Sequence, residues 1–229
     1  MTGEELQAAR KKSKLTQAGA AREIGVTQAY LSMLERGLRP MSEEVWRRAA
    51  GLYVLKPTDI PFSNYFFAAD PMPDDQLAGE LAALGYPGLS PQTSARIKNP
   101  IEVLVSALNA DERPDELVEA LPWLVINYSD MNWRALFYAA KVNDLQNRLG
   151  YITNLARRVA EHKGNHEVAS ILQKRESELE PSRLHREQTL CNESMHPEEQ
   201  NWLKTNRPQE ACHWRLIADL SPEHLDYYE

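Results

Sequence analysis

The amino-acid sequence predicts an all-α protein of two domains, and three observations lead to this prediction. Apolar residues recur at three- and four-residue spacing along most of the 229 residues, as in helices that bury one face. No convincing strand pattern or internal repeat appears. Residues 1–56 hold ten Lys and Arg against six Glu, a net charge of +4, which leaves −11 for residues 57–229 out of a total of −7. These observations indicate a small basic head followed by a larger acidic body.

A proline-rich segment separates the two predicted domains. Residues 57–73 contain four prolines and four aromatic residues. The prolines resist long regular structure, and the aromatics predict that the segment lies against one domain or against a second subunit. We therefore expect a small helical head in residues 1–56, a linker in residues 57–73, and an all-helical dimerisation or partner-binding body in residues 74–229.

The head is organised around two short predicted helices that meet at one glycine. Gly25 lies where the chain must turn, and glycine adopts the positive φ that such a turn needs. Thr27 supplies an N-cap hydroxyl for the second helix. Small or apolar residues occupy the positions at which two helices crossed at a wide angle bury a shared seam: Ala20, Ala21, Ile24, Val26, Leu31 and Leu34.

Two more helices complete the predicted head. The first covers residues 4–12 and ends in the cations Arg10, Lys11, Lys12 and Lys14, which we expect to face phosphate rather than only solvent. The last begins after Ser42, a good N-cap, and runs through residue 52 to close the small core.

The helix pair resembles the helix-turn-helix of the Xre, or phage-repressor, family over its whole stretch, TQAGAAREIGVTQAYLSMLERG. The flanking segments LQAARKKSKLTQ and GLRPMSEEVWRRAAGLY extend the resemblance to residues 2–55. It implies a head of the five-helix type whose second motif helix enters the major groove of DNA. An Xre-type head on a partner-binding helical body is also similar to antitoxins of toxin-antitoxin operons, which repress their own promoter and neutralise a toxin.

The outward face of the second motif helix predicts the base contacts. Gln28 is the expected base reader, because an amide pairs bidentately with adenine, whereas Ala29 and Met33 suit thymine methyls and Ser32 can donate or accept. The family pattern assigns phosphate contacts to Gln17, Arg36 and Arg39, and also to Thr16; Tyr30 contacts either a phosphate or the core. The expected DNA-binding set is Thr16, Gln17, Thr27, Gln28, Ala29, Ser32, Met33, Arg36 and Arg39, with Arg10 and Arg22 in second place.

The body is predicted as a series of helices. Breaks are expected near Pro122 and at Ser129–Asp130, and one long helix is expected over residues 133–161, with a bend near Asn143. The polar and aromatic residues between 132 and 148 predict either a buried network between helices, which we favour, or a ligand pocket. The other predicted helices cover residues 75–84, 101–108, a segment through Val168 that ends near residue 180, 197–205, 209–220 and 222–228.

Catalytic and metal motifs are missing from the sequence. There is no phosphate-binding glycine loop, no G-x-S-x-G and no H-E-x-x-H, so we expect neither enzymatic activity nor a cofactor. Histidine and cysteine gather late in the chain, but no C-x-x-C or H-x-x-x-H pair places two ligands on one helix face. We therefore expect no zinc site at His185, Cys191, His196, Cys212 and His213.

These observations together predict a sequence-specific DNA-binding transcriptional repressor. The N-terminus has no signal-like apolar stretch, and no apolar run approaches the ~20 residues of a membrane span, so we expect a cytoplasmic protein. The expected partners are a double-stranded DNA operator and a second copy in a homodimer. A cognate toxin is a further expected partner if the chain is the autoregulating antitoxin of its operon. The alternative is a one-component regulator whose helical body senses a small molecule.

Overall fold

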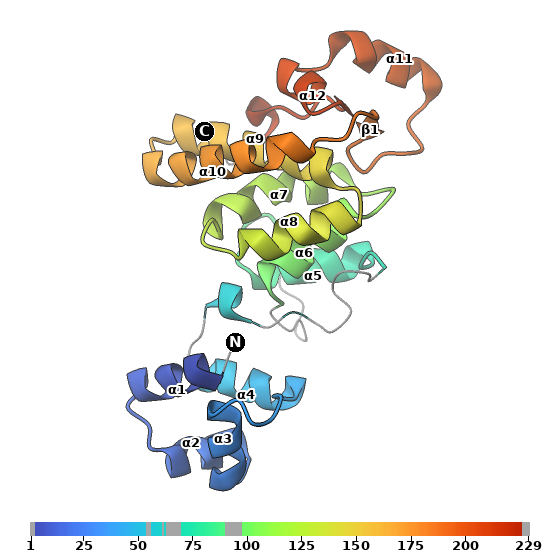
Figure 1. The fold of residues 1–229 in the computed structure, drawn as a ribbon. Helices are drawn as coiled ribbons and strands as arrows, with labels where there is room; N and C mark the ends of the chain where they lie inside the picture. The colour runs from blue at the N-terminus through green and yellow to red at the C-terminus, as the bar shows by residue number, and fades with distance from the viewer. Residues whose placement is uncertain (1–2, 54–55, 61, 63–69, 90–97, 226–229) are drawn as a thin grey trace. The chain divides into compact units, whose positions relative to one another are not determined.

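The computed structural model describes residues 3–53, 56–60, 62, 70–89 and 98–225 of the chain. Twelve α-helices and two strands of two residues each make up the regular structure of this part, which confirms the predicted all-α class. The chain divides into two compact units, Met1–Pro61 and Phe62–Glu229 (Figure 1). The division falls inside the predicted linker, of which residues 61 and 63–69 lie outside the described residues.

The first unit is a bundle of four α-helices followed by a short 3₁₀ turn (Figure 1). Its core is made by buried residues of all four helices, with Leu6, Ile24 and Leu31 completely buried. Among the described residues of this unit, a 3₁₀ turn, Pro57–Asp59, follows the fourth α-helix in place of the fifth helix that the resemblance implied. The helices are α1 (Gly3–Lys12), α2 (Gln17–Ile24), α3 (Gln28–Glu35) and α4 (Glu43–Tyr53).

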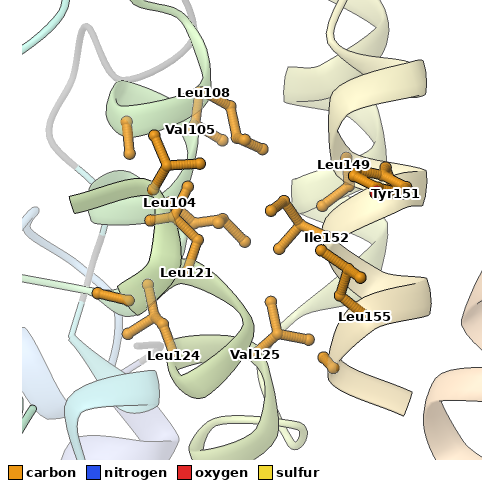
Figure 2. Packing of buried hydrophobic residues seen from close by; sticks show 14 of the residues in the cluster. Leu104, Val105, Leu108, Leu121, Leu124, Val125, Leu149, Tyr151, Ile152 and Leu155 are labelled. Atoms are coloured by element: carbon orange, nitrogen blue, oxygen red, sulfur yellow. The ribbon is translucent and has the colours of Figure 1, made fainter. Parts of the chain in front are cut away.

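The second unit is built around the long helix α9 (Gln146–His162), which packs against α7 (Asp115–Asn127) and α10 (His166–Leu179). Figure 2 shows side chains of α7, among them Leu121 and Val125, facing Ile152 and Leu155 of α9. The remaining helices of this part are α5 (Asp74–Ala83), α6 (Pro100–Leu108) and α8 (Trp133–Val142).

The C-terminal part of the second unit is less regular. A 3₁₀ turn (Glu180–Ser182) follows α10, and strand β1 (Gln188–Thr189) pairs in parallel with β2 (Leu216–Ile217). Between these strands lie α11 (Pro197–Asn206) and α12 (Gln209–His213), and a last 3₁₀ turn covers Pro222–His224.

The structure confirms three of the predicted body helices to within one residue, at α5, α6 and α11, and α10 ends within one residue of the end predicted for it. The single helix predicted over residues 133–161 is wrong, because the chain forms α8 and α9 with a break between them. Asn143 donates through Nδ2 to the carbonyl of Ala139 at 2.8 Å, and Asp144 adopts a φ of 56°. A left-handed residue after a helix end stops the helix instead of bending it.

Two other local predictions are wrong for opposite reasons. α7 continues through Pro122, because buried residues such as Leu121 and Leu124 on the same helix supply packing that outweighs one lost backbone hydrogen bond. The helix predicted over residues 209–220 ends at His213. Arg215 has a φ of 53° there, and the chain continues as β2, although no strand was predicted.

Asn147 and Arg148 at the start of α9 hold the C-terminal part in place. Arg148 donates to the carbonyls of Leu108, Ala110 and Thr189 at 2.8–2.9 Å and pairs with Glu193 at 2.8 Å. The Asn147 amide donates to two carbonyls and accepts from one backbone N–H in residues 184–186. These bonds support the buried network that the sequence favoured over a ligand pocket.

Candidate nucleic-acid interface

Both ends of α2 and the start of α3 are fixed by capping groups. The hydroxyl of Thr16 accepts from the backbone N–H of Gly19 at 3.0 Å, and that of Thr27 accepts from Tyr30 at 3.2 Å. Gly25 ends α2 with a φ of 77°. Each helix therefore begins at a side-chain cap, and the chain enters α3 through a glycine in the left-handed region.

Arg48 of α4 supports this turn from the side. Its guanidinium donates to the carbonyl of Ile24 at 3.1 Å and pairs with Glu44 at 2.5 Å. A Cβ at position 25 would lie 2.6 Å from Arg48 Nη1, which a flexible side chain can accommodate, so it is the positive φ that requires glycine. The sequence analysis missed Arg48, which lies on the outward side of a helix expected only to close the core.

A buried ion pair joins α1 to α3. The guanidinium of Arg10 donates to both carboxylate oxygens of Glu35, at 2.5 and 3.0 Å, and to the carbonyl of Leu15 at 2.9 Å. The side-chain amide of Gln17 donates to the same carboxylate at 3.0 Å. Arg10 therefore faces the interior of the head, which corrects the expectation that it faces phosphate, and the Gln17 amide is bound within the protein.

The hydrogen bonds set the charge state of this group. Burial by itself raises the pKa of the Glu35 carboxyl, but hydrogen bonds from Arg10 and Gln17 outweigh burial and hold that pKa below its usual value. Glu35 is only 3 % exposed and stays negatively charged beside its arginine. Burial and then the charge of Glu35 raise the pKa of the neighbouring Tyr53 to about 12.

The signal for Glu35 was present in the sequence. It lies four residues after Leu31, at the spacing that places both on one face of a helix. The sequence analysis missed this position because an acidic residue at the end of an exposed helix suggests solvent.

The face of α3 that remains outside carries no acidic group, because Glu35 is the only carboxylate of this helix. Gln28 and Ala29 in its first turn are exposed, whereas Ser32 and Met33 are partly buried. Tyr30 packs partly buried against the head core, which favours its core role.

Three arginines border this face, and all are exposed. Arg36, directly after α3, donates through Nε to the carbonyl of Ser32 at 3.2 Å, and Arg39 follows in the next loop. Arg22 lies on α2. Short polar and small residues on a helix between exposed cations can contact base edges while the cations neutralise phosphates.

No helix among the described residues is long and apolar enough to cross a membrane. Cys191 is buried and its thiol donates to the carbonyl of Ala107 at 3.5 Å, whereas Cys212 is exposed. No group of three or more metal-ligating side chains occurs within the described ranges.

Comparison with known proteins identifies the first unit. A family model described as a helix-turn-helix domain matches residues 3–61, about a quarter of the chain. No curated protein and no solved structure matches the chain significantly. The match includes the Thr16 and Thr27 caps, the turn at Gly25 and the outward face of α3. Residues 3–61 are therefore a helix-turn-helix domain, which supports a DNA-binding regulator.

Proposed function

We propose that the protein is an Xre-type transcriptional repressor that binds a specific operator by placing α3 in the major groove. One observation carries this proposal. The only carboxylate of α3, Glu35, is turned inward and bound by Arg10, so the outward face presents neutral groups between exposed cations. A free carboxylate on that face would repel the phosphates that line the groove.

The contacts divide into base readers and phosphate contacts. Gln28 pairs with adenine, Ala29 and Met33 contact thymine methyls, and Ser32 adds a hydrogen bond. Arg36 and Arg39 neutralise phosphates on either side of the groove.

The N-terminus of α2 supplies a further phosphate contact. Thr16 and Gln17 stand where the first backbone N–H groups of a helix have no intrahelical acceptor, and such groups bind anions. Because the Gln17 amide is already bound to Glu35, we propose that Gln17 uses its backbone N–H. Thr27 borders the same surface at the start of α3.

The protein works as a homodimer in this proposal. One recognition helix reads only a few base pairs, and a two-fold pair places two such helices about 34–36 Å apart on one side of the duplex. A selection from random duplexes should therefore enrich a palindromic sequence. Binding should weaken with salt, with a log–log slope of about −4 to −5 per head if four to six phosphates are neutralised. Enrichment of no sequence and a slope near zero would overturn the proposal.

For the body we propose partner binding, as in an autoregulating antitoxin, rather than the sensing of a small molecule. The polar groups Asn147 and Arg148 are bound to the backbone of the second unit, which favours a structural role for them. A hollow in the described body, lined by Asp115, Leu190 and Ile217 among others, measures about 210 Å³, below the ~300–1,000 Å³ of typical small-molecule sites.

Co-expression with the neighbouring gene tests the role of the body. A toxic neighbour that is neutralised by this chain and copurifies with it supports the antitoxin reading. A harmless neighbour, together with a metabolite that raises the melting temperature of the protein, would establish the sensor reading instead.

A further inference from the structure

Two places in the second unit expose large hydrophobic side chains. On α8, Tyr138 is 59 % exposed and Val142 is 51 % exposed, and on α11 Trp202 is 59 % exposed. No other large hydrophobic side chain among the described residues of this unit is exposed to this extent. Tyr138 and Val142 lie one helical turn apart, and neighbouring exposed apolar groups can form an interaction surface.

The exposed face of α8 is also positively charged. Arg134 and Lys141 lie on the same side of the helix as Tyr138 and Val142, because the four positions follow a spacing of four and then three or four residues. The helix contains no acidic residue. We call these four residues the α8 stripe.

The cations of the α8 stripe differ from most others in the unit. Eight arginines of the second unit form ion pairs with carboxylates. Within the part of the chain that the structure describes, neither Arg134 nor Lys141 has such a pair. In a unit that is strongly acidic overall, two unpaired cations beside exposed apolar groups favour a partner that is itself acidic.

The exposed face of α11 has the complementary composition. Glu198 and Glu199 precede Trp202 by four and three residues, so all three share one side of the helix. Neither carboxylate forms an ion pair with another described residue. We call these three residues the α11 patch.

We propose that the α8 stripe of one copy docks onto the α11 patch of a second copy. Arg134 and Lys141 would then meet Glu198 and Glu199, while Tyr138 and Val142 would cover Trp202. Figure 1 shows α8 and α11 well apart within the second unit, so the two surfaces of one copy do not cover each other. A two-fold axis makes this contact twice, once in each direction, and closes the assembly as a dimer.

The apolar part of the α8 stripe distinguishes this occupant from DNA. A phosphate backbone would use Arg134 and Lys141, but it offers no apolar group to cover the exposed surface of Tyr138 and Val142, whereas Trp202 does. The inference rests on the proposed function only in that a dimer is needed to read two half-sites.

A charge swap tests the contact in the full-length chain. Sedimentation velocity at micromolar concentration should show a dimer for the native protein. The variants Arg134→Glu/Lys141→Glu and Glu198→Lys/Glu199→Lys should each raise the dimer dissociation constant by roughly tenfold or more, and their combination should restore the dimer. Restoration excludes simple unfolding as the cause of the two losses. Lys163→Glu/Lys174→Glu is the matched control, because both lysines are exposed and lie outside the two surfaces.

Each other outcome decides against the inference. A monomeric native chain overturns it, as does a dimer that neither reversal weakens or that the combined variant fails to restore. Reduced operator affinity without any change in the dimer would assign the α8 stripe to DNA. The same variants distinguish the inference from the proposed function. If the dimer forms and is restored by the combined variant but binds no duplex, only the proposed function is overturned. If the chain binds its operator specifically while remaining monomeric, only the inference is overturned.

Discussion

Arg10 and Glu35 form a bidentate ion pair inside the head, with the guanidinium on the first helix and the carboxylate at the end of the recognition helix. Their side chains are 11 % and 0 % exposed. The pair fixes α3 against α1, and it removes the only negative charge from the helix that we propose to enter the groove. In the proposed complex, the stability of the head and its affinity for DNA would therefore depend on the same contact.

Removal of one partner of this pair should be costly. Glu35→Ala leaves a buried guanidinium without its carboxylate, and we expect a loss of about 3–5 kcal/mol in the unfolding free energy of the head. Arg10→Met/Glu35→Leu, which replaces the pair by apolar groups, should recover most of that loss. Hydrogen exchange of the α1 and α3 amides measures both effects. Equal destabilisation by the single and the double variants would contradict this account.

The same carboxylate predicts how the head responds to acid. Its pKa is lowered in the folded state from the ordinary value of 4.5, so its contribution to stability is complete above that pH. The contribution is lost as the pH falls through the lower folded value. Unfolding measured between about pH 6 and pH 3 should therefore show a steeper loss in the native chain than in Glu35→Gln. Parallel curves would show that Glu35 does not carry the dependence.

Substitutions should distinguish residues that contact bases from residues that contact phosphates. Gln28→Ala should relax preference at one base pair of the half-site at a cost of about 1–3 kcal/mol, because an amide-to-base pair is lost. Arg39→Ala should instead weaken binding to all duplexes alike and lower the salt slope. Fluorescence anisotropy with the operator and with single-base variants measures both, and Lys163→Ala in the body is the control of equal charge change. Uniform weakening by Gln28→Ala would remove it as a base reader.

The sequence predicted the local features of the head well, because they depend on neighbouring residues. The cap at Thr27 and the turn at Gly25 follow from residue chemistry within a few positions, whereas the cap at Thr16 was not predicted. The inward position of Arg10 did not follow, because it depends on Glu35, which is 25 residues away along the chain.

In the body, the spacing of apolar residues predicted most helices, but it failed where tertiary packing outweighs a local helix-breaking residue. Pro122 stays within a helix because its neighbours are buried, whereas residues 143–145 interrupt a helical pattern through one left-handed residue, Asp144. The end of α12 and the β1–β2 pair depend on contacts with α9 that no local pattern contains.

Arg148 should matter more for the fold than any surface arginine. Arg148→Met leaves three buried carbonyls without their donor and should lower the unfolding free energy of the body by about 3–5 kcal/mol. Arg186→Met is the matched control, because its pair with Asp144 has both side chains more than half exposed and should contribute only about 0–1 kcal/mol. Urea unfolding followed by circular dichroism compares the two. Similar midpoints for both variants would show that the network does not hold the C-terminal part.

Replacing glycine by alanine should have opposite effects at Gly150 in α9, which contacts Trp214, and at Gly51 in α4, which has open space around it. A Cβ on Gly150 would lie 2.3 Å from Cε3 of the fully buried Trp214, so the indole ring lies against the helix backbone itself. Gly150→Ala should therefore cost about 1–3 kcal/mol through displacement of the ring, even though alanine is the better helix former by about 1 kcal/mol. Gly51 lies in α4 with no atom within 4 Å of its would-be Cβ, so Gly51→Ala should stabilise the head by about 0.5–1 kcal/mol. Thermal unfolding of the two variants measures the difference, and a rise in melting temperature for both would mean that the Trp214 ring can move away from α9 without cost.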